Sequence, residues 1–372
     1  MLLKNKKIAI IGAGPVGLTM AKLLQQKGAH VTVYERDKNA QARIWGGTLD
    51  LHEATGQQAL KKAGLLEHYF ANATPMGRTL ADEKGNVFFA VQPERNTPEI
   101  NRNDLRTLLL NSLTSDTVVW DRKFTNLTIH NNKWLIHFED RPDAIADFVI
   151  GANGGMSAVR KYVTDAEVED TGTFIIQGEV HEPEINCPEF YKLCNNNILM
   201  TAHNGTLLAA NPNNHGALTY NVIIKTPEDW ADGNGNLQQS ETTSALLLKR
   251  LSGWNELYKQ LLTATTLFWG LPTRKLPLNI AWKSDRALPI TLIGDAAHVM
   301  PPFAGEGVNT GLMDTLLLSN NLTNGTFKTI EDAISNYEKQ MFVYATAAQT
   351  ETFKNELEMR NPDFSFKKRF SN

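Results

Sequence analysis

Residues 8–37, which read IAIIGAGPVGLTMAKLLQQKGAHVTVYERD, decide the fold. They begin with a short run of apolar and β-branched residues (8–11), which predicts a strand buried on both faces. The glycine turn GAGPVG (12–17) follows, and apolar residues at helical spacing then predict a helix that ends at Gly28. Residues 31–34 predict a second strand. This order of strand, glycine turn, helix and strand is typical of an open parallel sheet that binds a dinucleotide.

The glycines of this turn and one acidic residue predict how a dinucleotide would bind. Gly12 permits the tight turn, Gly14 lets the backbone approach a pyrophosphate, and Gly17 lets helix and strand pack closely. The pyrophosphate would lie at the N-terminus of the helix, which begins near Pro15. Glu35 lies close to the position, roughly 20 residues after the turn, at which a carboxylate binds a ribose hydroxyl. The alternative is a glycine turn with a structural role only.

Composition indicates an ordinary globular chain with two joined domains. The protein has 372 residues, of which 42% are hydrophobic and 21% are charged, and this length exceeds what one small core needs. The 37 basic and 40 acidic residues leave a net charge of −3. Electrostatics therefore gives no reason to expect nucleic acid or an anionic membrane as a partner. We expect a monomer that binds small molecules.

The cysteines and the apolar segments indicate the compartment. Cys187 and Cys194 have a spacing that fits neither a redox pair nor a zinc knuckle, so we expect free thiols and no metal site. The basic residues 4–7 precede an apolar run that is too short for a signal peptide. The chain has no apolar run long enough for a transmembrane helix. These features predict a cytoplasmic protein without stable membrane association.

Two further buried strands run into glycine turns. Residues 146–160 read ADFVIGANGGMSAVR, and this turn would lie beside the first one, at the carboxyl ends of neighbouring parallel strands. Residues 288–311 contain a strand that ends at Gly294 and Asp295, followed by a proline-rich loop. A helix is expected to begin near Gly307, and the unpaired amides at its start would point at a ligand.

The middle of the chain predicts an antiparallel sheet. Four segments alternate between apolar and polar residues, and they are residues 173–180, 198–203, 206–211 and 217–224. The pair Asn204-Gly205 predicts a two-residue hairpin turn between two of them.

Smaller elements are expected around these sheets. Residues 76–91 predict a hairpin that leaves the first sheet, and the stretch 233–240, rich in Gly, Asn and Gln, predicts a surface loop. A capping box at Thr329 predicts the start of a long amphipathic helix. A small meander is expected from residues 118–120, 124–129 and 134–138.

Three segments in this order resemble the single-component FAD-dependent aromatic hydroxylases, the class A flavoprotein monooxygenases. They are residues 12–17 with Glu35, residues 151–160 and residues 294–309, and the resemblance spans nearly the whole chain. The middle motif has Asn153 where the wider family usually has Asp. Within this class, residues 101–106, 152–160, 184–188 and 295–309 resemble more closely the tetracycline-inactivating monooxygenases of the Tet(X) type, which share this Asn.

This resemblance implies an α/β fold with three parts. A Rossmann-like FAD-binding domain would be discontinuous, an antiparallel-sheet domain would bind the substrate, and a C-terminal helix would bridge the two. The implied ranges are 1–75, 95–170 and 285–325 for the FAD-binding domain, 76–94 and 171–284 for the substrate domain, and 326–372 for the bridging helix.

The resemblance also implies which residues contact the cofactors. Glu35 would hold the adenosine ribose, Arg102 would contact the flavin side of FAD, and Asp295 would bind the ribityl chain. Helix-start amides beside the isoalloxazine would stabilise the negative charge of reduced flavin. NADPH would dock transiently, with Arg36 as a candidate contact. The predicted cofactor-binding residues are Gly12, Gly14, Pro15, Gly17, Glu35, Arg36, Arg102, Asp295, Pro302, Gly305, Gly307, Val308 and Asn309.

The implied reaction is hydroxylation of a phenolic or polycyclic small molecule, including tetracycline-type antibiotics. NADPH would reduce FAD, O2 would add at flavin C4a to form a C4a-hydroperoxyflavin, and the distal oxygen would pass to an electron-rich carbon. Because the cofactor supplies this chemistry, we expect no catalytic protein side chain. His298 follows the motif aspartate, and we interpret it as structural and not as a base.

The predicted substrate side departs from the tetracycline enzymes. Gln177 matches a glutamine that contacts the substrate there, whereas Ile198 stands in place of Arg and Thr219 in place of His. Each lost hydrogen bond to a buried substrate costs ~1–3 kcal/mol, so we expect an altered preference, for a smaller or more apolar polyketide or phenol. The predicted substrate-binding residues are Gln177, Ile198, Ala209 (Phe in those enzymes), Thr219, Pro302, Phe303, Gly305 and Met359. Met359 has packing as an alternative role.

Three other functions share some of these sequence features. A flavin-dependent halogenase would share the first glycine motif, but none of the seven tryptophans forms a Trp-x-Trp-x-Ile-Pro element. A plain NAD-dependent dehydrogenase would not need the Asp295 segment and would purify colourless. A flavoprotein that sequesters its ligand with little turnover also fits the sequence.

Overall fold

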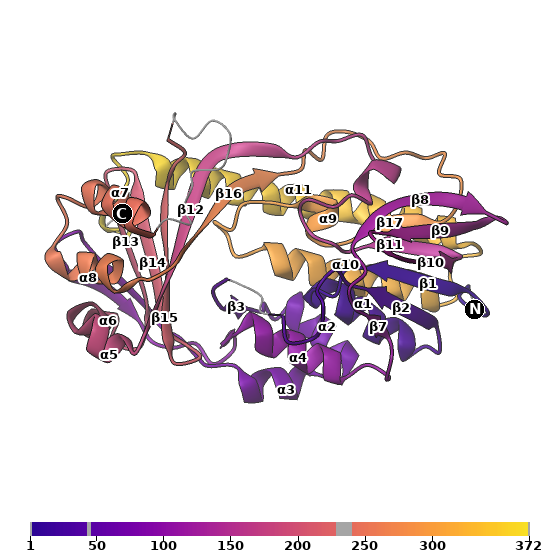
Figure 1. Cartoon of the computed structure of the whole chain (residues 1–372), viewed down its shortest axis with the longest axis horizontal. Helices are drawn as coiled ribbons and strands as arrows, with labels where there is room; N and C mark the ends of the chain where they lie inside the picture. The colour runs from indigo at the N-terminus through magenta and orange to yellow at the C-terminus, as the bar shows by residue number, and fades with distance from the viewer. Residues whose placement is uncertain (1, 43–45, 228–239, 371–372) are drawn as a thin grey trace.

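The computed structural model describes residues 2–42, 46–227 and 240–370. Two large sheets lie toward opposite ends of an elongated molecule, and a long helix runs along both of them (Figure 1). The fold is α/β, with a parallel Rossmann-like sheet at one end and an antiparallel-rich sheet at the other, as expected. None of the described helices is long and apolar enough to cross a lipid bilayer.

The parallel sheet has five strands, and its central strand is the one predicted from residues 8–11. Its strands in spatial order are β17 (Ile290–Leu292), β11 (Phe148–Gly151), β1 (Lys7–Ile11), β2 (His30–Tyr34) and β7 (Val118–Val119). All neighbouring pairs are parallel. The three glycine turns follow β1, β11 and β17, which are adjacent, so they meet at one edge of the sheet. The prediction that the second turn lies beside the first is confirmed.

Helices cover the parallel sheet and build its core. Helix α10 (Gly307–Thr323) packs against α1 (Pro15–Gln25), α2 (Gly56–Ala63) and α11 (Ile330–Arg360). The buried residues form one apolar cluster that includes Ile10, Leu18 and Leu312. The other elements of this part are α3 (Leu66–Asn72), α4 (Arg102–Asn111), α9 (Asp295–His298), the 3-10 helix η1 (Arg160–Tyr162) and the strand pair β3 (Leu49–Asp50) and β6 (Glu99–Ile100).

The meander prediction was wrong in one strand. Residues 118–119 form β7, which pairs with β2 at the edge of the parallel sheet. The three-stranded meander consists instead of β8 (Phe124–His130), β9 (Lys133–Phe138) and β10 (Arg141–Ala146). The short run at residues 118–119 carries no alternation that separates a parallel edge strand from a meander strand.

The second sheet has seven strands. They are β16 (Phe268–Lys275), β12 (Glu169–His181), β15 (Ala217–Lys225), β14 (Thr206–Asn214), β13 (Ile198–His203), β4 (Arg78–Ala81) and β5 (Val87–Val91). Asn204 and Gly205 have positive φ values of 48° and 67° and join β13 to β14, which confirms the predicted hairpin turn. The hairpin predicted at residues 76–91 is β4 with β5, and it extends this sheet.

One face of the seven-stranded sheet is the core of this part. Leu218, Tyr220 and Val222 of β15 lie in a buried cluster with residues of three helices. These helices are α6 (Pro188–Cys194), α7 (Ser240–Arg250) and α8 (Glu256–Ala264), and the short helix α5 (Pro183–Asn186) precedes α6. The opposite face of the sheet is therefore left to meet the rest of the chain. Residues 233–239 of the predicted surface loop lie outside the described residues.

Helix α11 joins the two sheets, as the predicted bridging helix. Near its start, Thr329 caps it by accepting a hydrogen bond from Asp332 N (3.0 Å), and Tyr337 donates to the carbonyl of Leu292 in β17 (2.9 Å). Near its end, Arg360 donates to the carbonyl of Thr171 in β12 (2.6 Å). The chain ends with the short helix α12 (Phe366–Phe370).

Both cysteines are expected to be unreactive in the native protein. Cys187 and Cys194 are free, fully buried thiols of the second core, and burial raises the pKa of Cys187 to about 11 and that of Cys194 further. Because only the thiolate reacts, Ellman's reagent should label no cysteine in buffer and two in urea. Labelling of a thiol before unfolding would contradict this burial.

Candidate functional site

The first glycine turn is shaped by close backbone approaches and leaves one side open. Gly12 has φ +113°, and a Cβ there would lie 2.5 Å from the carbonyl oxygen of Ala152. A Cβ on Gly17 would lie 2.1 Å from the carbonyl oxygen of Gly12. By contrast, a Cβ on Gly14 would meet no atom within 4 Å. Gly14 thus borders open space at the start of α1, where an anionic phosphate binds best.

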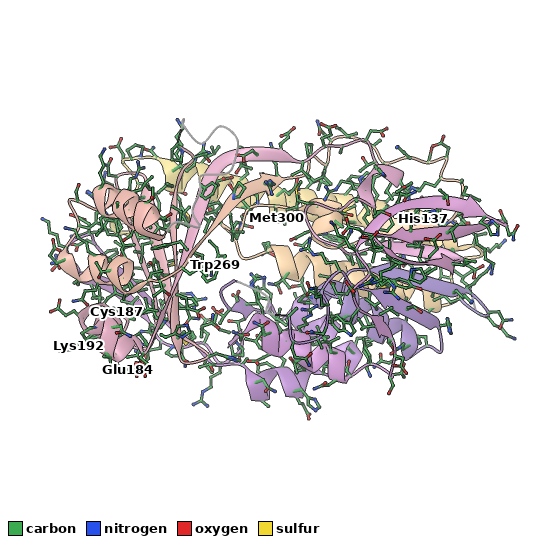
Figure 2. The ribbon with its side chains drawn as sticks, in the orientation of Figure 1. His137, Glu184, Cys187, Lys192, Trp269 and Met300 are labelled. Carbon is green, nitrogen blue, oxygen red and sulfur yellow. The ribbon has the colours of Figure 1, made fainter. Side chains whose placement is uncertain are left out.

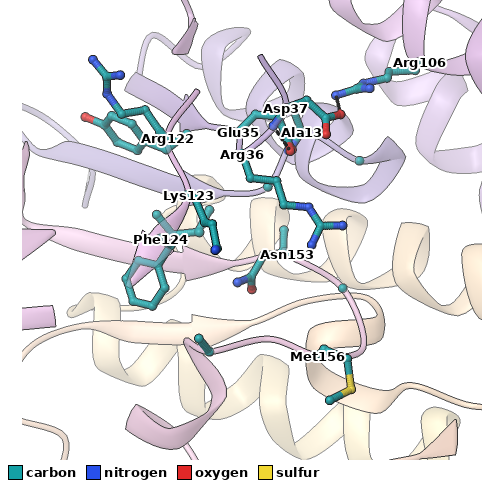
Figure 3. A pocket seen from close by; sticks show the side chains of 17 residues that line it. Ala13, Glu35, Arg36, Asp37, Arg106, Arg122, Lys123, Phe124, Asn153 and Met156 are labelled. Atoms are coloured by element: carbon teal, nitrogen blue, oxygen red, sulfur yellow. Dashed lines mark hydrogen bonds and ion pairs between the residues drawn. The ribbon is translucent and has the colours of Figure 1, made fainter. Parts of the chain in front are cut away.

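This open space is a cavity of about 400 Å³. Figure 3 shows that Arg36, Lys123 and Asn153 point into it from three segments. Glu35 lies in its wall, is 8% exposed, and accepts hydrogen bonds from Ala13 N (2.6 Å) and Asp37 N (3.0 Å). The cavity brings the first and second glycine turns together, and two acidic and four basic side chains line it, so its excess of positive charge suits an adenosine diphosphate moiety.

Asp295 begins α9 directly after β17, at the same edge of the sheet. Its carboxylate accepts no hydrogen bond from the described residues, and it lies beside the start of α10, where a Cβ on Gly307 would be 3.9 Å from Oδ1. One side of this carboxylate is exposed, and protein surrounds the rest of it. The resulting loss of hydration raises the pKa of Asp295 despite the positive charges of His298, Arg102 and Arg160. It is free to accept hydrogen bonds from a polyhydroxyl chain.

Arg102 is the first residue of α4, as expected from the helix start at Asn101. Asn101 caps this helix by accepting a hydrogen bond from Asn103 N (2.7 Å). The guanidinium donates from Nε to the carbonyl of Gly47 (3.0 Å), and burial lowers its pKa while Asp295 opposes that shift. Arg102 and Asp295 therefore belong to one site, although they are far apart in the sequence.

Asp314 holds the turn at Asp295 against α10. It is fully buried in α10 and accepts hydrogen bonds at Oδ2 from Gly294 N (2.6 Å) and His298 Nε2 (2.8 Å), and at Oδ1 from Tyr344 of α11. Burial alone would lower the pKa of His298, but the charge and hydrogen bond of Asp314 outweigh it and raise that pKa. These contacts match the structural interpretation of His298.

Arg160 connects the second and third glycine segments. It donates from Nε to the carbonyl of Ala296 (2.9 Å) and from Nη2 to the carbonyls of Gly155 (2.6 Å) and Asp295 (3.2 Å). Burial lowers the pKa of Arg160 to about 10, which Asp295 opposes. The guanidinium thus holds the turns after β11 and β17 at a constant separation.

The side chain of Asn309, a predicted cofactor-binding residue, contacts protein backbone. Its side chain is fully buried, accepts from His52 N (2.8 Å) and donates to the carbonyls of Asp50 (3.1 Å) and Gly305 (3.2 Å). The amide therefore clamps the loop after β3 onto α10. A contact of this residue with a cofactor would have to come from its backbone.

The other predicted loop residues lie before and at the start of α10. Pro302 and Gly305 are exposed, and Gly307 and Val308 are half-buried in the first turn of the helix. Phe303 is fixed by α11, since its N–H donates to Thr352 Oγ1 (3.1 Å) and its carbonyl accepts from Asn355 Nδ2 (3.2 Å).

The predicted substrate residues lie on the face of the seven-stranded sheet opposite its core. In the register, Gln177 of β12 is opposite both Asn221 and Trp269, and Asn221 is opposite Ala209. Side chains alternate between the two faces of a strand, and Thr219 and Ile198 fall on the same face as Gln177. Trp269 also lies on this side of the sheet (Figure 2). The residues are Gln177, Ile198, Ala209 and Thr219, and Met359 of α11 packs near Ala209 in an apolar cluster.

The face of the sheet is tied to the parallel-sheet part. Asn211 of β14 donates from Nδ2 to Thr48 Oγ1 (2.9 Å), just before β3, and Asn101 donates to Asn214 Oδ1 (2.5 Å). The face that carries Gln177 and Thr219 is therefore held toward the loop that Asn309 clamps.

A model of the family described as FAD binding domain matches residues 5–348. The chain belongs to this family of class A flavin monooxygenases. The monooxygenase asqM of Emericella nidulans is 27% identical, with 94% of each chain covered. Kynurenine 3-monooxygenase of Cytophaga hutchinsonii is 27% identical over 96% of this chain and 81% of that protein. The crystal structure of tetracycline destructase Tet(51) shares the fold, with TM-score 0.74, 18% identity, and coverage of 96% and 92%.

Membership of this family shows that the chain is a flavoprotein oxidoreductase with FAD as cofactor. The structure itself also fits FAD, because Gly14 borders open space and no donor among the described residues bonds the Asp295 carboxylate. The family acts with O2 on small aromatic substrates.

Two polar networks of the flavoprotein were not predicted from its sequence. Glu99 accepts from Arg78 Nη2 (2.8 Å) and Thr48 Oγ1 (2.7 Å), and burial raises its pKa. His52 lies 3.8 Å from Asp50 and 3.6 Å from Glu306, and these carboxylates, Asp50 first, raise its pKa despite burial. These residues lie in short strands and loops without periodicity.

Proposed function

We propose that this flavoprotein uses NADPH to reduce its FAD and inserts one atom of O2 into a phenolic or polycyclic substrate, with tetracycline-type molecules among the candidates. The observation that carries this proposal is the placement of Gln177 and Thr219 on a sheet face that the Asn211–Thr48 bond (2.9 Å) holds toward the loop beside Asp295. The similarity in fold to tetracycline destructase Tet(51) is the reason for including tetracycline-type molecules among the candidate substrates.

The chain's own residues would bind and orient, and bound FAD would supply the redox chemistry. Glu35 would accept hydrogen bonds from the adenosine ribose, with Arg36 and Lys123 near the diphosphate. Asp295 would accept from the ribityl hydroxyls, and Arg102 would stand near the flavin. The amides at the start of α10, from Gly305 to Asn309, would stabilise negative charge on the reduced ring.

The substrate surface combines few polar groups with apolar ones. Gln177 and Thr219 are each 4% exposed and offer amide and hydroxyl groups, whereas Ile198 and Ala209 offer only apolar surface. Pro302, Phe303, Gly305 and Met359 would complete the site from the cofactor side. Such a site favours a flat, largely apolar ring system with one or two polar substituents.

The predicted domain division and cellular setting belong to the same proposal. The FAD-binding domain would comprise 1–75, 95–170 and 285–325, the substrate domain 76–94 and 171–284, and the bridging segment 326–372. We infer a monomeric protein that works in the cytoplasm.

Oxygen labelling tests the reaction. The purified yellow protein is incubated with NADPH, ¹⁸O2 and either a tetracycline or simple phenols, and products are analysed by mass spectrometry. We expect NADPH oxidation and a product that carries one ¹⁸O atom, because the oxygen comes from O2 and not from water.

Controls separate the parts of this proposal. Gln177→Ala should lower product yield per NADPH consumed, since O2 that is not used on a loosely held substrate would reoxidise the reduced flavin and leave as hydrogen peroxide. If phenols gave labelled product and tetracyclines gave none, tetracycline-type molecules would be excluded as substrates. Tight ligand binding without labelled product from any substrate would overturn the monooxygenase proposal and favour sequestration.

A further inference from the structure

One row of side chains crosses the sheet face that carries Gln177, from strand β16 to strand β13. In the strand register each member lies directly opposite the next, and the members are Trp269, Gln177, Asn221, Ala209 and Met200. Directly opposed residues point to the same face of a sheet, with Cβ atoms roughly 4.5–5.5 Å apart. We name this set the amide row, because Gln177 and Asn221 lie side by side in it.

The two amides of this row have no protein partner. Gln177 is 4% exposed and Asn221 is half-buried, yet neither side chain forms a hydrogen bond with a described residue. Neither amide is among the described polar groups that lack both a partner and accessible surface. Since a polar group as buried as that of Gln177 normally has a partner, the pair is open to a ligand on this face.

The rows on the two sides of the amide row differ in polarity. One of them, the apolar row, consists of Leu271, Ile175, Ile223 and Leu207. Met359 of α11 belongs to the same apolar cluster as Leu207 and Ile223. The other, the polar row, contains Glu179, Thr219 and Asn211. A flat ring can therefore lie across the amide row toward the apolar row, with the indole of Trp269 as an aromatic neighbour.

These three rows offer no positive charge to an anion. The one charged side chain among the residues named in them is Glu179, which lies 3.0 Å from His181. Arg78 of the neighbouring strand β4 is bound by Glu99 (2.8 Å). Because a charged group that is buried without a partner is costly, an uncharged ligand should bind this face more tightly than a carboxylate.

We propose that Asn221 determines substrate specificity together with Gln177, and that this pair selects an uncharged aromatic ketone with a hydroxyl group on the neighbouring ring carbon. One amide donates to the ketone oxygen, and the other bonds the hydroxyl group as donor or acceptor. Because the two Cβ atoms are only about 5 Å apart, the two oxygens must be neighbours on the ring. This inference rests on the proposed substrate face and names the class of molecule that it takes.

Calorimetric titration of the FAD-loaded protein, without NADPH, tests this inference. The ligands are 2-acetyl-1-naphthol and 1-hydroxy-2-naphthoate, which share the rings and the hydroxyl group and differ in charge. We expect the ketone to bind roughly tenfold more tightly. Asn221→Leu keeps the size of the side chain and removes the amide, so affinity for the ketone should fall about tenfold, as for the loss of one hydrogen bond. The matched control Asn213→Leu, at an exposed position of β14 outside these rows, should bind the ketone like wild type.

Asn221→Lys gives a second readout that does not depend on a loss of binding. It adds a cation to the amide row, so the preference should shift from the ketone to 1-hydroxy-2-naphthoate. Equal binding of the ketone by wild type and Asn221→Leu, no binding of it by wild type, or tighter binding of the carboxylate by wild type would overturn the inference. Tight binding of the ketone without any ¹⁸O-labelled product would overturn the proposed reaction and not the selection of the ligand by Asn221.

Discussion

Asp314→Ala is expected to lower the free energy of unfolding by about 3–5 kcal/mol, the usual cost of removing one partner of a buried charged network. The carboxylate accepts from Gly294 N, His298 Nε2 and Tyr344 within a fully buried site. Alanine leaves these three donors without an acceptor. Since Gly294 precedes Asp295, the variant should also bind FAD more weakly.

Urea unfolding followed by circular dichroism measures this loss. Asn320→Ala is the matched control, because Asn320 is exposed on the same helix, and it should change the free energy of unfolding by less than about 0.5 kcal/mol. Asp314→Asn keeps the shape of the side chain and should lie between the two. A wild-type midpoint in Asp314→Ala would show that the network does not hold the fold.

The effect of Asp314 should depend on pH, with a sign set by His298. The pair raises the pKa of His298 above its ordinary value, since the charge and hydrogen bond of Asp314 outweigh burial. Stabilisation by a raised pKa is fully present below the unfolded-state pKa and is lost as pH rises through the folded-state pKa. The stability gap between wild type and Asp314→Asn should therefore shrink as pH rises above neutrality.

Gly14→Ala and Gly12→Ala are expected to separate cofactor binding from folding. Gly14 has φ −77°, which alanine adopts readily, and its Cβ would meet no protein atom. The methyl group would instead occupy the space where we place the diphosphate. FAD affinity should fall roughly 10- to 100-fold, as for the loss of one hydrogen bond to a charged group, while the apoprotein keeps its stability.

Gly12→Ala should fail in both respects. Its Cβ would lie 2.5 Å from the Ala152 carbonyl oxygen at φ +113°, so β1 and β11 cannot keep their present separation. Flavin fluorescence titration and thermal unfolding of the apoproteins give the two readouts. If Gly14→Ala bound FAD like wild type, the cradle would not be where we place it.

Much of the parallel sheet could be predicted from the sequence because its signals are local. Residues 8–11 and 148–151 are continuous apolar runs that only a doubly covered strand buries, and each leads into glycines. The glycine turns then meet because parallel strands place their carboxyl ends at one edge. The hairpin at Asn204 has an equally local signal, the need for positive φ.

The remaining part of the site depends on contacts that have no local signal. Glu99 meets Thr48 and Arg78 across two sheets, and no spacing rule connects these residues. Asn309 was expected beside the flavin ring, yet its amide is taken by Asp50 and His52 in three dimensions. Hydrophobic periodicity predicts which face of an element is buried, but not which polar groups pair there.

The position of β17 in the parallel sheet has a consequence for biosynthesis. This strand completes the edge with the three glycine turns, yet it leaves the ribosome long after β1. At translation rates of about 5–20 residues per second, the interval is on the order of 15–60 s. Strand β11, which is made about halfway through that interval, pairs with β1 on one side and must wait for β17 on the other. We therefore expect the FAD site to form only after synthesis has passed Asp295.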